Sequence, residues 1–204
     1  MKQNDFDKIA AVYDWLARFV FGKNIIHAQK FFLNKISDGA TVLILGGGTG
    51  EILAEIVKNK NGIQVCYVEL SPEMISIAKK KFDSNHQIQF IEGTENNIPS
   101  DKKFDVVITN FYLDLFSNQS LKFVLEKIKK STTTQALWLV TDFVNDRLWH
   151  RAMLKMMYLF FRITCNIEAT NLPNWRNEMI KLGGIEIDSK FFYGKFIKSS
   201  VFQF

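Results

Sequence analysis

Cysteine, proline and long apolar runs are scarce in this sequence, and each scarcity excludes a class of protein. The two cysteines, Cys66 in a predicted strand and Cys165 after a predicted helix, provide neither a disulfide framework nor the ligand spacing of a zinc site. Only three prolines occur, and there is no repeat or low-complexity tract. No apolar run approaches the ~20 residues that a membrane-spanning helix needs. We therefore expect reduced cysteines, no metal site and no membrane span.

The composition is that of one compact domain. Hydrophobic residues make up 47% of the 204 residues, which is enough to bury a sizeable core. The first residues lack the basic and then apolar pattern of a secretory signal, so a cytoplasmic location is expected. The net charge is +5, but the lysines within 79–81 and 127–130 fall at the ends of predicted helices, where cations complement the helix dipole. A nucleic-acid partner is therefore not expected from the charge.

The most informative segment is residues 42–50, Val-Leu-Ile-Leu-Gly-Gly-Gly-Thr-Gly. An apolar strand breaks into a glycine-rich turn, and the helix-forming residues 51–57 follow. Four glycines within five positions allow positive φ angles and remove the Cβ atoms that would keep a ligand away from the main chain. Because a structural turn seldom needs more than one or two glycines, this turn is predicted to bind a ligand.

The spacing of the glycines bears on which ligand is bound. A dinucleotide fingerprint is G-x-G-x-x-G, whereas Gly46, Gly48 and Gly50 form G-x-G-x-G, and Glu51 stands where the longer fingerprint has its last glycine. A carboxylate there is unfavourable beside a pyrophosphate. Glu69 follows the next predicted strand, where an acidic side chain can accept hydrogen bonds from both hydroxyls of a ribose. The glycine turn combined with Glu69 indicates the kind of ligand much more specifically than the glycine turn alone.

Three blocks resemble the class I S-adenosylmethionine-dependent methyltransferases in order and spacing. They are residues 42–50, residues 68–74 (Val-Glu-Leu-Ser-Pro-Glu-Met) and residues 104–110 (Phe-Asp-Val-Val-Ile-Thr-Asn). The resemblance implies an α/β fold with a doubly wound, Rossmann-like sheet of seven strands, an antiparallel last strand and helices on both faces. It also implies that S-adenosylmethionine lies across the ends of the first four strands.

The rest of the chain alternates helix and strand, as this fold requires. Helices are expected at 5–21, 24–36, 51–57, 72–82, 118–130, 146–163 and from 172 to about 183, and strands at 42–45, 64–68, 88–91, 104–109 and 136–141. Pro173 would open the helix that stops near Gly183. Residues 185–192 and 196–204 flank a glycine turn suited to a hairpin. We expect one domain over residues 1–204, with N-terminal helices in 1–38 and a helical lid inserted at 146–183.

The resemblance implies a cofactor site residue by residue. Gly46, Gly48 and Gly50 would line the methionine moiety and the ribose of the cofactor. Glu69, followed by Leu70, would hold the ribose hydroxyls.

Other cofactor contacts involve departures from the family pattern. Thr94 stands where the family typically has an aspartate beside the adenine, so its hydroxyl, the neighbouring Glu95 or the backbone alone would accept a hydrogen bond from the adenine amino group. Ile44 stands where the family often has an acid. Asn110 would meet the methionine part of the cofactor. Tyr13 would either cover the cofactor or pack on the sheet.

Methyl transfer needs little catalytic machinery beyond positioning. It is an in-line displacement, so holding the nucleophile and the methyl carbon together in a dry pocket supplies much of the acceleration. A base matters only if the acceptor loses a proton. Asp114, Asp142 and His150 are the candidates near the pocket mouth, although each is equally compatible with a cap or a surface position.

The predicted helix at 146–163 is the most individual segment. Cations at 147, 151, 155 and 162 fall broadly on one face and leave methionine, leucine and phenylalanine to the other. As a lid, its adaptable methionine-rich wall would suit a small apolar or aromatic acceptor. The same pattern is compatible with peripheral contact to a membrane surface, or with a helix that merely covers the sheet.

Three other functions are weighed against a small-molecule methyltransferase. A short-chain NAD(P)-dependent reductase needs Tyr-x-x-x-Lys, and none of the five tyrosines has lysine four residues later. A nucleic-acid amino methyltransferase usually carries Asn-Pro-Pro-Tyr after the fourth strand, where this chain has Asn-Phe-Tyr-Leu at 110–113. A non-enzymatic partner protein of the same fold stays open because of Ile44 and Thr94. The sequence leaves the acceptor and the oligomeric state undetermined.

Overall fold

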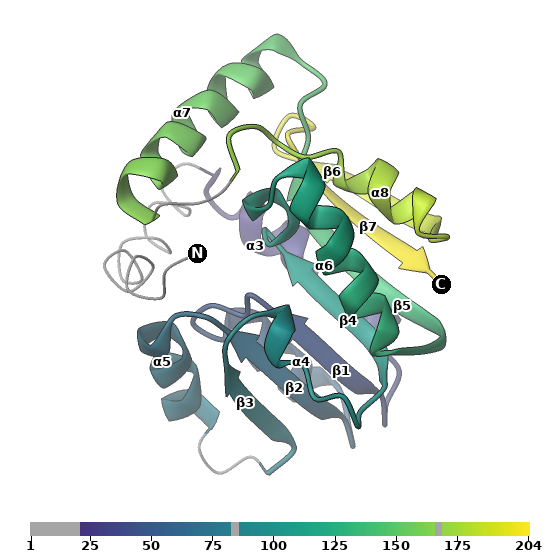
Figure 1. The fold of residues 1–204 in the computed structure, drawn as a ribbon. Coiled ribbons are helices and arrows are strands. Elements are labelled where there is room, and N and C mark those ends of the chain that lie inside the picture. Colours follow the sequence, from purple (N-terminus) through teal and green to yellow (C-terminus); the bar gives the residue numbers. More distant parts are fainter. Residues whose placement is uncertain (1–20, 83–85, 166–168) are drawn as a thin grey trace.

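The computed structural model describes residues 21–82, 86–165 and 169–204, and Figure 1 shows their arrangement. The strands are β1 (Thr41–Leu45), β2 (Gln64–Glu69), β3 (Ile88–Glu92), β4 (Phe104–Asn110), β5 (Thr132–Phe143), β6 (Ile185–Phe192) and β7 (Ile197–Gln203). The helices are α3 (Asn24–Lys30), α4 (Glu51–Asn59), α5 (Pro72–Phe82), α6 (Asn118–Lys130), α7 (Leu148–Cys165) and α8 (Trp175–Lys181), with 3-10 turns η1 (Leu33–Lys35), η2 (Glu95–Asn97) and η3 (Leu113–Leu115). Tyr13 and, apart from Phe21, the expected helix at 5–21 lie outside the described residues.

The strands form one seven-stranded sheet in the order β3-β2-β1-β4-β5-β7-β6. Strands β1 to β5 are parallel, whereas β7 runs antiparallel to both β5 and β6. The expected doubly wound sheet with an antiparallel last strand is therefore confirmed. The chain reverses its direction of growth between β1 and β4, and ligands bind at such a switch point beyond the carboxyl ends of the strands.

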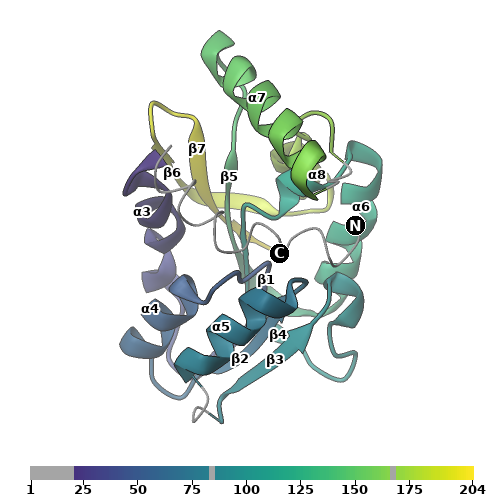
Figure 2. The ribbon, with the colours of Figure 1, turned by 90° about the vertical axis from the view of Figure 1, so that its left-hand side faces the viewer.

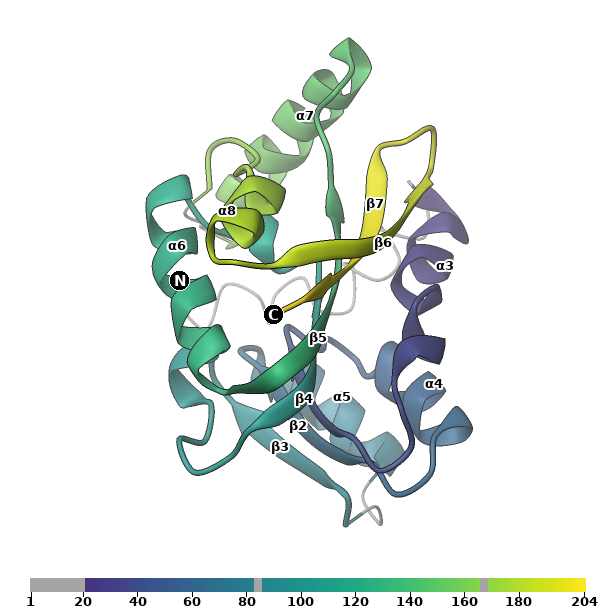
Figure 3. The same cartoon turned by 90° about the vertical axis from the view of Figure 1, so that its right-hand side faces the viewer.

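The central strands are buried on both faces because successive side chains point to opposite sides of the sheet. Val42 and Ile44 pack in the cluster that includes α4 and α5 side chains, whereas Leu43 and Leu45 pack with α6 and α8. Figure 3 shows α6 and α8 on one side of the sheet and α3 and α4 on the other. This two-sided burial explains the continuous apolar run of β1. Cys66 of β2 is also buried, and burial raises the pKa of its thiol to about 11.

A third apolar cluster lies at the carboxyl edge of the sheet, where α7 packs. Leu154 and Tyr158 of α7 contact a cluster that contains Phe111, Phe143 and Phe196. In Figure 2, α7 lies beyond the end of the sheet, away from α4 and α5. The expected lid position of this helix is therefore at the end of the sheet where a cofactor would bind.

The structure corrects several expected boundaries. The helix expected at 24–36 ends at Lys30, because Phe32 has φ −102° and ψ 9°, after which the chain forms the η1 turn. Strand β5 begins at Thr132, four residues before the expected start. Its first residues are polar and carry no apolar pattern, although Thr132 is in register with Phe104 of β4.

Helices α7 and α8 also begin later than expected. Helix α7 spans 148–165 instead of 146–163. Pro173 precedes α8 rather than opening it, because the side chain of Asn174 accepts a hydrogen bond from the Asn177 N–H and serves as the N-cap. The expected glycine stop is confirmed by Gly183, which has φ 97° directly after the end of the helix.

Candidate cofactor and acceptor site

The glycine turn follows β1 and lies at the carboxyl edge of the sheet. Gly46, Gly48 and Gly50 have φ angles of 65°, 64° and 88°, in the left-handed region that favours glycine. Gly50 is the residue before α4, and Glu51 opens that helix, where its charge complements the positive end of the helix dipole. The backbone geometry thus explains three of the four glycines.

The surroundings of the glycines differ. A Cβ atom on Gly46 would lie 2.8 Å from the ring of Tyr112, and one on Gly47 would lie 2.2 Å from the ring of Tyr67. A Cβ atom on Gly48 would have no neighbour within 4 Å among the described residues. The protein's own aromatic rings therefore require Gly46 and Gly47, and Gly48 is the position beside open space.

Two side chains hold the glycine turn from neighbouring elements. The Tyr67 hydroxyl donates to the Gly48 carbonyl at 2.7 Å, and Lys81 Nζ of α5 donates to the Thr49 carbonyl at 2.8 Å. A buried tyrosine needs a partner for its hydroxyl, so Tyr67 in an apolar strand is a signal that sequence reasoning missed. Lys81 is exposed in the last turn of α5, as expected, and its hydrogen bond to the glycine turn is an additional contact.

Glu69 is fixed at the end of β2, next to the glycine turn. Its Oε2 atom accepts a hydrogen bond from the Gly48 N–H at 2.8 Å, and its Oε1 atom accepts one from the Ser71 N–H at 2.9 Å. The residue is 7% exposed, while Leu70 is half-buried. The two backbone donors hold a rigid carboxylate between the ends of β1 and β2.

The loop after β3 uses Thr94 and Glu95 differently. The Thr94 hydroxyl accepts a hydrogen bond from the Asn96 N–H at 3.2 Å, while the Asn97 side chain accepts one from the Thr94 N–H at 3.1 Å. This capping box engages Thr94. The Glu95 carboxylate instead accepts a hydrogen bond from the Tyr112 hydroxyl at 2.8 Å. Because the Tyr112 ring also lies against Gly46, Glu95 is held beside the glycine turn.

The other departure from the family pattern, Ile44, is a core residue. It is 2% exposed and lies in register with Tyr67 of β2 and Ile108 of β4. Asn110 ends β4 and is paired with Thr141 of β5, so it lies at the same edge as the glycine turn.

Asp114 and Asp142 lie together at the carboxyl ends of β4 and β5. Asp142 is fully buried, and its carboxylate accepts hydrogen bonds from the Phe143 N–H at 2.8 Å and the Asp114 N–H at 3.2 Å. Asp114 is 7% exposed, and its Oδ1 atom has no hydrogen-bond partner among the described residues. The structure thus brings two sequence-predicted catalytic residues into one buried acid pair.

Burial changes the proton affinity of this acid pair. Burial raises the pKa of Asp114 from 3.8 to about 7. Burial, together with the neighbouring charge of Asp114, raises the pKa of Asp142 as well, although its backbone hydrogen bonds oppose the rise. Two carboxyls in such surroundings resist simultaneous ionisation. The pair is therefore able to accept or release a proton near neutral pH.

Helix α7 reaches the acid pair through Tyr158, not through His150. The Tyr158 hydroxyl donates to the Asp114 carbonyl at 3.2 Å. His150 is fully buried, with ring centroids 4.2 Å from Trp149 and 5.2 Å from Phe196. Neither of its nitrogens has a hydrogen-bond partner in the described part of the chain, and burial lowers its pKa. His150 is therefore a neutral ring in an aromatic cluster, without a hydrogen bond to either aspartate.

Two other features bear on the location of the site. A cavity of about 390 Å³, lined by residues that include Asp38 and Asp105, opens at the amino ends of the strands. It is thus at the opposite edge from the glycine turn. Among the described residues, no helix is both long enough and apolar enough to cross a bilayer.

Known proteins with similar sequences and folds include several methyltransferases. A family model described as a methyltransferase domain matches residues 42–135. The demethylmenaquinone methyltransferase of Chlorobaculum tepidum is 27% identical, in an alignment that covers 99% of this chain and 77% of that protein.

Solved structures agree with this match at the level of the fold. A chain in the complex of the Haloferax volcanii Trm112 methyltransferase activator with its methyltransferase has a TM-score of 0.75 at 18% identity, covering 97% of this chain and 96% of that one. The N-methyltransferase NodS of Bradyrhizobium japonicum, solved with S-adenosyl-L-homocysteine, has a TM-score of 0.63 at 10% identity, covering 88% and 83%.

The matched segment contains the features that the structure brings to the carboxyl edge of the sheet. Residues 42–135 include the glycine turn, Glu69, Glu95 and Asn110. The strand order and the antiparallel β7 agree with the same family. The matched segment, the strand order and the similar proteins together support a class I methyltransferase that uses S-adenosylmethionine as the methyl donor.

Proposed function

We propose that this enzyme methylates a small apolar or aromatic acceptor that loses a proton in the reaction. The observation that carries this proposal is the buried pair of Asp114 and Asp142 at the cofactor edge of the sheet, next to the apolar cluster under α7. Demethylmenaquinone, the acceptor named for the Chlorobaculum relative, is a quinone and supports the same class.

The glycine turn and Glu69 fit the ribose and methionine parts of the cofactor. Gly48 lies beside open space, and the fixed Glu69 carboxylate lies next to it, within hydrogen-bond distance of the Gly48 N–H. We assign the ribose hydroxyls to Glu69 and close backbone contact to Gly48. Gly46 and Gly50 shape the turn, and Leu70 lines the ribose.

The loop after β3 fits the adenine. Because the Thr94 hydroxyl caps η2, we assign the adenine amino group to Glu95, which Tyr112 holds beside the turn. Asn110 would contact the methionine part from the end of β4. Tyr13 remains an expected cover of the cofactor.

The acid pair would serve proton transfer. When bound, S-adenosylmethionine supplies a methyl group on a sulfonium sulfur, which keeps the electron pair of the broken bond. The acceptor atom forms the new bond to carbon with its own electron pair, and its proton passes to the ionised carboxylate of the Asp114–Asp142 pair. We assign His150 to the packing of α7, since its buried ring lies against Trp149 and Phe196 and makes no hydrogen bond to either aspartate among the described residues.

We propose a shorter lid than the one expected from the sequence. Residues 1–204 act as one domain, but within 146–183 the two helices have different roles. Trp175 and Met179 of α8 pack in the cluster that includes α6, so only α7 would serve as the acceptor lid.

Methyl transfer from labelled cofactor to a panel of quinols, phenols, amines, lipids and RNA tests the proposal. We expect label in a quinol or phenol, with a rate that falls by about 100-fold or more in Asp114→Asn and in Asp142→Asn. The matched control Asp101→Asn, an exposed aspartate, keeps the parent rate. Activity on RNA alone would overturn the acceptor class, and full activity in both aspartate variants would overturn the role of the acid pair.

A further inference from the structure

Helix α7 carries a second apolar face that points into solvent. Leu148, Met156, Leu159 and Ile163 are 83%, 62%, 61% and 77% exposed. The period of the α-helix places these four residues on one side of α7, because they are separated by three, four or eight positions. Of the three roles expected for this helix, a helix that merely covers the sheet does not account for these exposed side chains.

The exposed apolar side chains lie opposite the face by which α7 is attached. His150, Leu154 and Tyr158 follow one another at every fourth position and are buried. A lid needs only this one buried face. The exposed stripe of Leu148, Met156, Leu159 and Ile163, here called the outer stripe, therefore has no role in covering the site.

A row of cations runs along one edge of the outer stripe. Arg151, Lys155 and Arg162 are exposed and lie on α7 between its buried face and the outer stripe. Helix α7 contains no acidic residue. An apolar face bordered by basic side chains on a surface helix is the pattern of helices that lie in the interface of an anionic membrane.

We propose that the outer stripe of α7 docks on an anionic lipid surface. Leu148, Leu159 and Ile163 would enter the boundary between headgroups and acyl chains, while Arg151 and Lys155 would pair with lipid phosphates. The opposite face of the same helix reaches the acid pair through the Tyr158 hydroxyl. Docking would therefore bring the acceptor site to the membrane, where the apolar acceptor of the proposed function dissolves.

Flotation of the purified protein with vesicles tests this docking without cofactor or acceptor. We expect binding to phosphatidylcholine vesicles that contain phosphatidylglycerol, much weaker binding to phosphatidylcholine alone, and loss of binding at high salt. Replacing Leu148→Gln together with Leu159→Gln lowers the partition coefficient by about tenfold or more. Replacing Arg151→Gln with Lys155→Gln lowers it by about fivefold for each cation removed.

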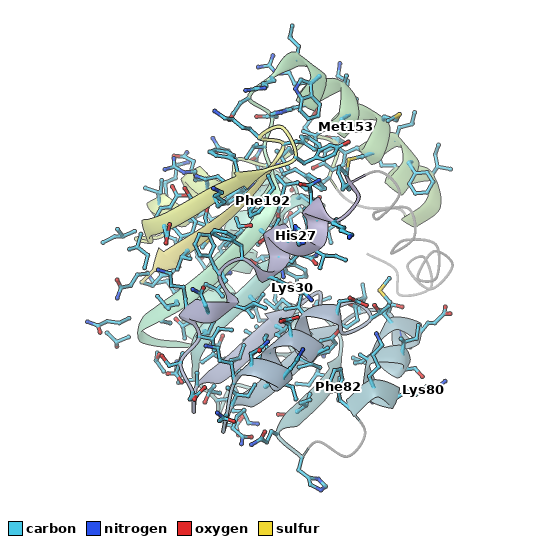
Figure 4. All side chains as sticks on the ribbon, turned by 180° about the vertical axis from the view of Figure 1, so that it is seen from behind. His27, Lys30, Lys80, Phe82, Met153 and Phe192 are labelled. Atoms are coloured by element: carbon cyan, nitrogen blue, oxygen red, sulfur yellow. The ribbon has the colours of Figure 1, made fainter. Side chains whose placement is uncertain are left out.

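Matched controls come from the other end of the molecule. Phe123→Gln changes an apolar residue that is 64% exposed on α6, and Lys79→Gln with Lys80→Gln removes two exposed cations from α5. Figure 4 marks Lys80 far from Met153 of α7. We expect parent binding in both controls and an unchanged circular dichroism spectrum in all variants.

Three results would overturn the docking proposal. The first is no binding to anionic vesicles, and the second is an equal loss of vesicle binding in the α5 control. The third is self-association without lipid that Leu148→Gln abolishes, because a second copy of the chain would then cover the outer stripe. Vesicle binding and methyl transfer to a soluble phenol are separate measurements. A protein that does not bind vesicles can therefore still support the proposed function, and a protein that does not methylate the phenol can still support the docking proposal.

Discussion

The cofactor half of the molecule, residues 41–110, and the acceptor half, residues 111–204, are built in different ways. In the cofactor half, the glycine turn and Glu69 follow directly after adjacent parallel strands, and backbone N–H groups fix the carboxylate. In the acceptor half, Asp114, Asp142 and Tyr158 come from a turn, a strand and a helix. A binding site can thus be assembled from short local motifs, or from single residues that only the fold brings together.

The two halves also differ in how their buried polar groups are satisfied. Glu69 and Glu95 both accept hydrogen bonds from the protein. Asp114 Oδ1 and both nitrogens of His150 have no such partner among the described residues. Buried polar groups without partners are costly and are found where a protein uses strain or reactivity. This difference supports the proposal that the first half binds the cofactor and that Asp114 in the second half takes part in proton transfer.

The largest expected effect concerns how the free energy of unfolding depends on pH. Burial raises the pKa of Asp114 from 3.8 to about 7, so the folded protein holds this proton more tightly than the unfolded chain. Stability from this source is complete below about pH 4 and is lost as the pH rises through about 7, by about 4 kcal/mol in total. Urea unfolding at about pH 4 and about pH 8 should show this loss in the parent and a smaller one in Asp114→Asn, where the buried Asp142 still resists ionisation. Identical pH profiles for the parent and this variant would remove the distinction between the halves.

The next largest effect concerns cofactor affinity. Glu69→Ala removes a carboxylate proposed to accept two ribose hydrogen bonds, each worth about 1.5 kcal/mol or more, so binding should weaken by about 100-fold. Calorimetry with S-adenosylmethionine and S-adenosylhomocysteine measures this change. Glu126→Ala, at a partly exposed position on α6, serves as the control with parent affinity. Equal affinities in Glu69→Ala and Glu126→Ala would contradict the site.

Two glycine variants separate folding from binding within the turn. Gly47→Ala brings a Cβ atom to 2.2 Å from the Tyr67 ring and should cost about 2 kcal/mol of unfolding free energy through overpacking. Gly48→Ala meets no neighbour in the described part of the chain, but Gly48 has φ +64°, which should cost about 1 kcal/mol. Urea unfolding and calorimetry should show the larger loss of stability in Gly47→Ala and a loss of cofactor affinity in Gly48→Ala. A stable Gly48→Ala with parent affinity would show that no ligand approaches there.

The smallest expected effect compares two tyrosine hydroxyls. Tyr158→Phe loses the hydrogen bond to the Asp114 carbonyl, and Tyr67→Phe loses the one to the Gly48 carbonyl, each at a cost of about 1 kcal/mol in unfolding free energy. Only Tyr67→Phe should weaken cofactor binding measured by calorimetry. If Tyr158→Phe weakened it equally, the two halves would not be separate.

Much of the cofactor half could be predicted because its signals are local. Residues 42–50 specify a strand, a turn with positive φ angles and a helix, and the structure confirms all three. The ring of Tyr112 over Gly46 could not be predicted, since it joins the ends of two strands that are far apart in the chain. The use of Thr94 as a cap is a different case, because its capping partners are local and lie within the same loop. From the sequence, the Thr94 hydroxyl was considered only as an acceptor for the adenine amino group.

The acceptor half was predicted less completely because burial decides its chemistry. Asp114 and Asp142 were candidates only by their position after strands, and the sequence did not show that they share one buried site. The charge pattern of α7 indicated an amphipathic helix, but it could not show that Leu148 and Ile163 stay exposed.

The sequence by itself indicated most of the strands and helices, and its resemblance to a known family implied the fold class and the cofactor, because the motifs that carry the resemblance are short local segments. Tertiary structure decided the order of the strands in the sheet, which carboxyls lie buried together and which face of α7 remains uncovered. These properties depend on packing between distant segments, since the proton affinity of a carboxyl and the exposure of a side chain are set by neighbours that adjacent residues do not specify.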